Sequence, residues 1–245
     1  MRKVCVFVEG QTELIFVREF LLKWYEYQDI SIACYQLLGN DMLPAEYDYP
    51  MQEASVFYQL VNVGNDNRVL SWLLNRVGSL KKEGYEMIIG LRDMYGEFYR
   101  KKSKTINVEL NQQIIDNVQE QIVNKLADDK DMVAFHFAIM EIESWMLAMH
   151  QSLLKKFADL KLDDIQTIYD IQECTDNTIY HPAEILDKVF QLAECRYEKH
   201  KTDANSILSY IDKDDFELLY NSGRSQSFNS FVDTLLLGKC FVVVE

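Results

Sequence analysis

The chain has 245 residues, of which 48% are hydrophobic and 26% are charged, proportions typical of a soluble globular protein. Its formal net charge of −14 excludes a broadly basic surface for nucleic acid, although Arg100, Lys101, Lys102 and Lys104 form one local basic cluster. No stretch approaches the ~20 apolar residues that span a bilayer, and the N-terminal segment has no small-residue cleavage site. We therefore expect a cytoplasmic protein with no membrane partner.

The cysteines are odd in number, far apart and without a CxxC pair. This distribution argues against both a disulfide framework and a zinc site. We expect reduced and mostly buried thiols at Cys5, Cys34, Cys174, Cys195 and Cys240.

Apolar, β-branched runs alternate with segments of helical period in the first part of the chain. The expected strands lie at 4–8, 29–38, 53–64, within 85–99 and at 131–139. The expected helices lie at 14–24, 65–83, about 109–127 and about 141–156, and helical periodicity then continues nearly to the end, with one helix at 182–199. The last residues, KCFVVVE, resemble a short strand or a docked tail. The pattern predicts an α/β core over residues 1–157, with a mostly parallel sheet, and a helical C-terminal extension over 158–245 packed on that core.

The first predicted strand runs directly into Glu9. Its continuous apolar sequence, VCVFV, is typical of a strand covered on both faces in a parallel sheet. Gly10 allows a sharp turn into a helix that Thr12 can cap and whose first turn Glu13 makes acidic. Open α/β sheets build their sites at this carboxyl edge, although Glu9 alone is equally compatible with a solvated loop residue.

Acidic residues follow three of the predicted strands: Glu9 after CVFV, Asp93 after MIIGLR, and Glu141 with Glu143 after FHFAIM. Because the carboxyl ends of parallel strands share one edge of a sheet, we expect these carboxylates to converge. Converging carboxylates repel one another unless cations lie between them, and Mg²⁺ or Mn²⁺ suits such an oxygen-only site. Two such ions can activate a water and stabilise the leaving oxygen in a phosphodiester displacement.

Each of these residues also has a purely structural interpretation. Asp93 can cap a turn, Glu143 can lie on the surface of an amphipathic helix, and Glu13 can act only on its own helix. His136 lies inside an apolar strand and is expected to be a core histidine, and His181 is expected to be a turn residue. The joint pattern of acids at three strand ends favours the functional interpretation.

Three segments resemble, in the same order, the motifs of Toprim domains, specifically those of DUF4276-type and OLD-nuclease-like proteins. VFVEGQTELIFVREFL resembles the first motif, an apolar strand followed by Glu-Gly-x-Thr-Glu or Asp and a helix. IGLRDMYGEFY resembles the second, a strand ending in Asp before a tyrosine-containing glycine turn, and FHFAIMEIESWMLA resembles the third, a strand leading to Glu-x-Glu. With YEKHKTDANSIL and SQSFNSFVDTL in the helical part, the resemblance covers roughly residues 1–237.

The resemblance implies a Toprim-like (Rossmannoid) fold with four parallel strands and a Mg²⁺-dependent endonuclease acting on DNA or RNA. It also implies a role in bacterial antiviral defence beside an ATPase partner. In this interpretation Glu9 and Asp93 are catalytic, and both bind the metal together with Glu141 and Glu143.

The sequence departs from the Toprim pattern at position 95, where Tyr95 stands in place of the second acid of the usual Asp-x-Asp pair. Glu97, or the pair Glu141 and Glu143, is expected to supply the missing charge, with Glu13 close by. If none of them does so, the second metal ion is in doubt. The candidates for neutralising phosphate charge near the site are Arg92, Arg100, Lys101 and Lys102.

Two other functions are open. Tyr95 and the acidic second half of the chain, where residues 131–245 contain 10 basic and 20 acidic residues, favour a non-catalytic Toprim-fold subunit that binds a partner protein. A different carboxylate-pair hydrolase, such as a glycosidase, is disfavoured because Trp24, Trp72 and Trp145 fall at helical core spacing. The sequence fixes neither the type of nucleic acid nor the oligomeric state.

Overall fold

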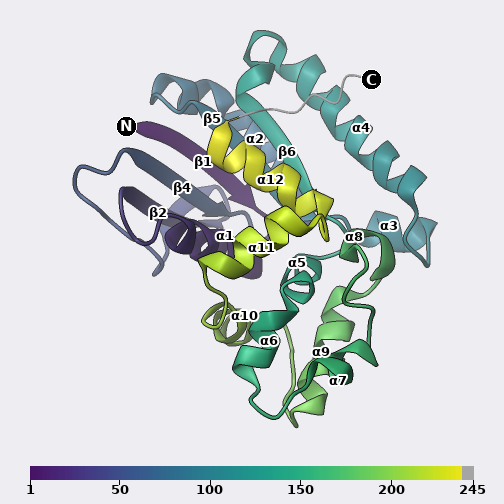
Figure 1. Ribbon diagram of the computed structural model, residues 1–245. Helices are drawn as coiled ribbons and strands as arrows, with labels where there is room; N and C mark the ends of the chain where they lie inside the picture. Colours follow the sequence, from purple (N-terminus) through teal and green to yellow (C-terminus); the bar gives the residue numbers. More distant parts are fainter. Residues whose placement is uncertain (239–245) are drawn as a thin grey trace. The chain divides into compact units, whose positions relative to one another are not determined.

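The computed structural model describes residues 1–238, which form two compact units (Figure 1). The first unit contains Met1–Arg92, Glu109–Phe137 and the segment from Ser230 onward, and the second contains Asp93–Val108 and Ala138–Asn229. Each unit therefore consists of segments that are far apart in the sequence. The predicted tail at 240–245 lies outside the described residues.

A six-stranded sheet forms the centre of the first unit, in the order β3-β2-β4-β1-β5-β6. The strands are β1 (Arg2–Val8), β2 (Ile30–Leu38), β3 (Asp41–Pro44), β4 (Val56–Asn62), β5 (Met87–Asp93) and β6 (Val133–Ala138). β1 pairs in parallel with β4 and β5, β2 pairs in parallel with β4, and β3 pairs antiparallel with β2. The mostly parallel α/β sheet expected from the sequence is confirmed, and it has six strands where the resemblance implied four.

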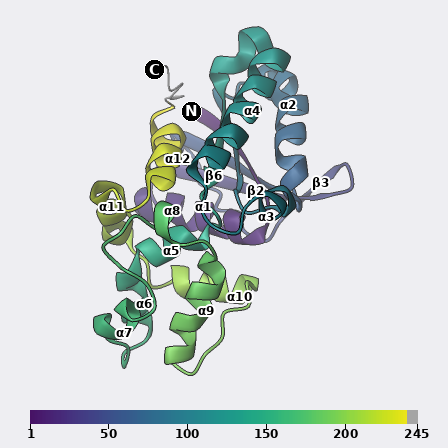
Figure 2. The same ribbon diagram turned by 90° about the vertical axis from the view of Figure 1, so that its right-hand side faces the viewer.

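Helices cover both faces of this sheet. They are α1 (Gln11–Trp24), α2 (Asp66–Lys82), α4 (Val108–Leu126) and α12 (Gln226–Leu237), with a 3₁₀ turn at Ala127–Met132. α1 and α12 lie on one face, and α2 and α4 lie on the other (Figure 2). On the first face, the hydroxyl of Tyr58 in β4 donates to the carbonyl oxygen of Leu235 in α12 over 3.2 Å. The core is thus closed on both sides by amphipathic helices.

Gly90 in β5 is required by the packing on the second face. A Cβ atom at this position would lie 2.4 Å from the ring of Phe135 and 3.2 Å from the side chain of Leu73. Because no real Cβ tolerates such a distance, the ring of Phe135 fills the space that a side chain would need. The small residue lets β5 and β6 pack closely against α2.

The second unit is helical. Its helices are α3 (Glu97–Lys102), α5 (Glu143–Ala148), α6 (His150–Lys156), α7 (Leu162–Gln166), α8 (Thr175–Thr178), α9 (Pro182–Leu192), α10 (Lys201–Leu208) and α11 (Lys213–Ser222). Trp145, at the centre of α5, is fully buried, and its Nε1–H donates to Ser227 Oγ over 2.8 Å. Its ring contacts that of Phe228 edge to face. α5 is therefore the central helix of this unit.

Three predicted helix boundaries were wrong. The first helix begins at Gln11 with Gly10 as the N-cap residue, so Thr12 lies inside the helix and does not cap it. The helix expected at about 141–156 is interrupted at Met149, between α5 and α6. The helix that begins at Pro182 ends at Leu192, because the following segment contains left-handed backbone at Glu194.

The prediction for His136 agrees with the structure. His136 is a hydrogen-bonded histidine in the first unit, and its Nε2 lies 3.0 Å from Thr234 Oγ1. Burial lowers the pKa of His136 to about 4. In the part of the chain that the structure describes, every helix is too short or too polar to cross a membrane.

Candidate metal centre

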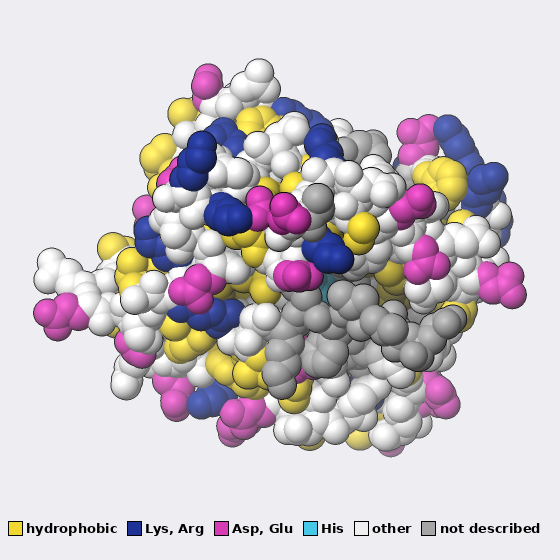
Figure 3. Space-filling model, turned by 90° about the horizontal axis from the view of Figure 1, so that it is seen from above, with side chains coloured by type: hydrophobic (Ala, Val, Ile, Leu, Met, Phe, Trp, Pro, Cys, Tyr) yellow, Lys and Arg dark blue, Asp and Glu magenta, His cyan; other side chains and the backbone are white. Residues whose placement is uncertain are grey.

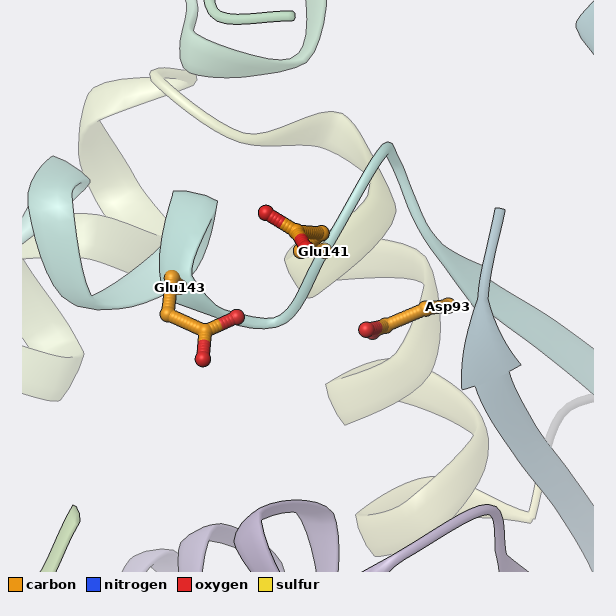
Figure 4. A group of neighbouring side chains, drawn as sticks. All are labelled: Asp93, Glu141 and Glu143. Carbon is orange, nitrogen blue, oxygen red and sulfur yellow. The ribbon is translucent and has the colours of Figure 1, made fainter. Parts of the chain in front are cut away.

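Three acidic side chains of the second unit meet in one cluster: Asp93, Glu141 and Glu143 (Figure 4). One carboxylate oxygen from each residue lies within 4.8 Å of those from the other two. Asp93 and Glu143 are buried, and Glu141 is half-buried. These are the acids predicted to follow the strands that became β5 and β6, so the sequence-based expectation of convergence is confirmed for these three.

The cluster depends on where helix α5 begins. Two residues that are two positions apart in a helix point in different directions. Glu141 lies before α5, whereas Glu143 is its first residue, so the backbone changes direction between them and both carboxylates face the cluster. Two glutamates at this spacing can face the same site when one precedes the helix and the other begins it, and this is the arrangement of Glu141 and Glu143.

Backbone hydrogen bonds connect the segment after Asp93 to the segment before Glu141. The backbone N–H of Tyr95 donates to the carbonyl oxygen of Met140 over 2.8 Å, and Met140 has a left-handed backbone with φ of 61°. The backbone N–H of Ile142 donates to Asp93 Oδ1 over 2.9 Å. Asp93 therefore satisfies an N–H group at the start of α5 while its carboxylate stays in the cluster.

Each glutamate is oriented by a donor from the α9 region. The hydroxyl of Tyr197, a buried residue after α9, donates to Glu143 Oε1 over 2.8 Å. The backbone N–H of Ala183, in the first turn of α9, donates to Glu141 Oε2 over 3.0 Å. In each glutamate one carboxylate oxygen is held in place by these donors.

The carboxylate of Glu143 is buried, and one of its oxygens accepts no hydrogen bond among the described residues. Its side chain is only 1% exposed, and its Oε2 is buried without a hydrogen-bond partner among the described residues. Burial raises the pKa of Glu143, although the charge of Lys199 and the hydrogen bond from Tyr197 act in the opposite direction. A buried carboxylate oxygen without a donor is costly, and a cation would satisfy it.

Lys199 supplies one positive charge to the cluster. Its Nζ lies 2.7 Å from Glu141 Oε1 and 3.3 Å from Glu143 Oε2. Burial lowers the pKa of Lys199, but the facing carboxylates raise it more, and the result lies above the usual lysine value. Lys199 brings one positive charge to three carboxylates, and a divalent cation would add two more.

The sequence interpretation assigned no role to Tyr197 or Lys199. Both lie in the segment YEKHKTD, whose sequence indicates no function apart from the resemblance. Their contacts join residues 54 and 58 positions apart. A tyrosine and a lysine in a short polar connection give no periodicity or spacing that indicates such a role.

The other predicted acids are Glu9, Glu13 and Glu97, and the cluster of the second unit does not include them. Glu9 follows β1 and Glu13 lies in the first turn of α1, both in the first unit, and their predicted part in the centre stays a prediction. Glu13 is buried, and its Oε2 lies 2.9 Å from the position that a Cβ of Gly10 would take. Glu97 has a 71% exposed side chain, 2.6 Å from the Nζ of Lys101.

The predicted phosphate-binding residues fall into two groups. Arg92 belongs to the first unit, where its guanidinium lies 5.3 Å from the ring centroid of Phe137. The others, Arg100, Lys101 and Lys102, form the exposed last turn of α3 in the second unit. The second group thus belongs to the same unit as the acidic cluster.

A protein-family model described as "Domain of unknown function (DUF4276)" matches residues 8–236. No curated protein and no solved structure matches the chain. The matched region includes the acidic cluster, Tyr197 and Lys199, and nearly all of the described residues. The chain belongs to the DUF4276 family.

Proposed function

We propose that this protein is a metal-dependent endonuclease whose centre binds Mg²⁺ or Mn²⁺ through Asp93, Glu141 and Glu143. The observation that carries the proposal is a cluster of three carboxylates in which the buried Glu143 Oε2 accepts no hydrogen bond among the described residues and has Lys199 Nζ 3.3 Å away. All three candidate ligands are oxygen atoms, the ligand type that hard divalent cations prefer. The donor set therefore fits such an ion.

The residues around the centre would fix the ligands before a metal arrives. Tyr197 holds Glu143 Oε1, the backbone N–H of Ile142 holds Asp93 Oδ1, and the backbone N–H of Ala183 holds Glu141 Oε2. A divalent ion, when bound, supplies an activated water and positive charge for a phosphate. Lys199, whose side chain is 40% exposed, adds a cation at the rim that can approach a substrate anion.

Nucleic acid is the proposed substrate class for two reasons. The basic residues of α3 supply local positive charge in the unit that holds the acidic cluster. The resemblance to Toprim domains favours phosphodiester hydrolysis, with Glu9 and Asp93 as catalytic residues. It also favours a cytoplasmic role in bacterial antiviral defence beside an ATPase partner.

A non-catalytic, partner-binding subunit is the second candidate, and one contact favours it. Lys199 already bridges Glu141 and Glu143, so the acids have a structural partner without any metal. In that case the cluster would hold the segment after α9 in place and would not bind an ion.

Calorimetric titration with Mn²⁺ separates the two candidates. Asp93→Asn, Glu141→Gln and Glu143→Gln keep an oxygen acceptor but remove the negative charge, and each should lose Mn²⁺ binding. Glu97→Gln, at the exposed acid on α3, is the matched control and should bind as the wild type does. Metal-dependent cleavage of plasmid or tRNA by the wild type would then support the endonuclease. Absence of Mn²⁺ binding by the wild type would overturn the metal centre and favour the partner-binding subunit.

A further inference from the structure

Tyr95 connects the acidic cluster to the basic helix α3. It lies two residues after Asp93, and its backbone N–H is bonded to Met140, the residue before Glu141. α3 begins two residues later, at Glu97. The chain thus passes from carboxylates to an aromatic ring to basic side chains within about ten residues of one unit.

Tyr95 belongs to a cluster of half-buried aromatic rings. Its ring centroid lies 5.4 Å from that of Tyr180 and 5.1 Å from that of His181, both nearly perpendicular. The hydroxyl of Tyr180 donates to the carbonyl oxygen of Ser103 over 2.8 Å, which anchors the cluster at the end of α3. The guanidinium of Arg100 lies 5.7 Å from the ring centroid of Tyr95. The ring is therefore held in place next to a positive charge.

α3 exposes a second ring among its basic residues. Phe98 is 56% exposed, and the Nζ of Lys102 lies 5.9 Å from its ring centroid. Figure 3 shows Lys and Arg side chains beside a hydrophobic one at the right-hand margin, where α3 lies in Figure 1. The residues of this surface, here called the α3 surface, are Tyr95, Phe98, Arg100, Lys101, Lys102 and Lys104.

We propose that the α3 surface binds single-stranded nucleic acid next to the metal centre. Aromatic rings stack on unpaired bases of any sequence, and nearby arginine and lysine side chains contact the phosphates. A duplex hides its base faces, so it would use the charges of this surface but not the rings. The inference rests on the proposed function, and it adds the substrate class: an unpaired strand or the single-stranded part of a longer molecule.

Carboxylates near the α3 surface explain why the rings are needed. Glu97 pairs with Lys101. The pKa of Tyr95 is raised by burial first, then by Tyr180, and the charge of Glu141 adds to this. These negative charges weaken a purely electrostatic attraction to phosphate. Stacking on Tyr95 and Phe98 supplies binding that does not depend on net charge.

The test measures fluorescence anisotropy of labelled 12-nucleotide oligo(dT) and oligo(U), and of a DNA duplex of the same length, with Ca²⁺ in the buffer. The wild type should bind at least one of the single strands about tenfold more tightly than the duplex. Phe98→Ala and Tyr95→Ala should each weaken that binding about fivefold or more, by loss of a stacking contact. Tyr210→Ala is the matched control, because Tyr210 is 41% exposed beneath Lys156 in the same unit but outside the α3 surface, and it should change nothing.

Two readouts keep this inference distinct from the proposed function. Phe98 is exposed, so its loss leaves the fold intact even where the Tyr95 variant does not fold. Mn²⁺ binding is measured on the same preparations. If the wild type binds Mn²⁺ but binds single strand and duplex equally tightly, the proposal for the α3 surface is overturned and the metal centre is not. The same conclusion follows if the wild type binds Mn²⁺ and Phe98→Ala leaves single-strand binding unchanged. If the wild type prefers single strands to the duplex but does not bind Mn²⁺, the α3 surface is supported and the metal centre is overturned.

Discussion

The Nζ of Lys199 lies 2.7 Å from Glu141 Oε1, so an amino group from the connection between α9 and α10 contacts the carboxylate that precedes α5. The same amino group lies 3.3 Å from Glu143 Oε2, the oxygen that lacks a hydrogen-bond donor. Lys199 therefore stands where a metal ion would share the same ligands. A lysine in that position competes with a metal through charge repulsion.

Lys199→Met should make Mn²⁺ bind about tenfold more tightly, because the divalent ion no longer meets an ammonium that is only partly screened by solvent. The metal-free variant should be less stable by about 1–2 kcal/mol, since two carboxylates lose their counter-charge. Calorimetry and urea denaturation give the two values. Lys188→Met, at an exposed position of α9, is the control. Weaker Mn²⁺ binding in Lys199→Met would show that the lysine assists the centre.

Tyr197→Phe should weaken Mn²⁺ binding about tenfold, because partners that orient metal ligands have effects of this size. The change removes only the hydroxyl that donates to Glu143 Oε1. The ring contact with Phe190 is kept, so the fold should persist. Tyr210→Phe removes an exposed hydroxyl and serves as the comparison in the same calorimetric titration. Equal affinities in the two variants would contradict the orienting role of Tyr197.

The stability of the metal-free protein should depend on the charge of Glu143. Burial raises the pKa of this group in the folded state above the value of 4.5 for an unperturbed glutamate. The folded state therefore holds its proton more tightly, and this contribution to stability is present at low pH and is lost as pH rises through the folded pKa. Glu143→Gln stays neutral, so its melting temperature should rise relative to that of the wild type as pH increases from 4.5. A constant difference across pH 4–8 would contradict this account.

Saturating Mn²⁺ should reverse that pH trend in the wild type. The metal binds the ionised carboxylate, so its affinity should rise with pH over the same range, and binding should release protons. Ligand binding to the folded state adds stability by mass action. Melting curves with and without Mn²⁺ at each pH check this. In Glu143→Gln, the rise in melting temperature caused by Mn²⁺ should increase little with pH.

Gly90→Ala should destabilise the protein by about 1–3 kcal/mol, because the new Cβ would overlap the ring of Phe135 in a packed core. Gly78→Ala is a matched control within α2, where a Cβ meets nothing within 4 Å. That change should stabilise the helix by about 0.5–1 kcal/mol. Urea denaturation should therefore give changes of opposite sign in the free energy of unfolding of the two variants. An unchanged free energy of unfolding in Gly90→Ala would mean that the ring of Phe135 can move aside.

The sequence predicts the parts of this fold that repeat a strong local pattern. Continuous apolar runs indicated five of the six strands, because buried parallel strands need hydrophobic residues on both faces. β3 was missed because its four residues, DMLP, are few, mostly exposed and end in proline. The interruption at Met149 was also missed, because apolar residues continue through it and the periodicity hardly changes.

The centre shows the same limit. The convergence of Asp93, Glu141 and Glu143 was predictable because each lies at or after the end of a strand, and strand ends share an edge in a parallel sheet. Lys199 and Tyr197 were not, because they reach the cluster from a connection whose path depends on the packing of α9. Pairings across more than fifty residues are set by tertiary structure, and no local rule encodes them.

The left-handed backbone at Glu194 and Lys199 has a consequence for the chain between α9 and α10. Such conformations are unfavourable for these residue types and persist only where surrounding contacts impose them. Tyr197 and Lys199 provide contacts of this kind, and both end on the acids of the cluster. The shape of this connection is thus tied to the charge state of Glu141 and Glu143, so its protease sensitivity and amide exchange should report what these two acids bind.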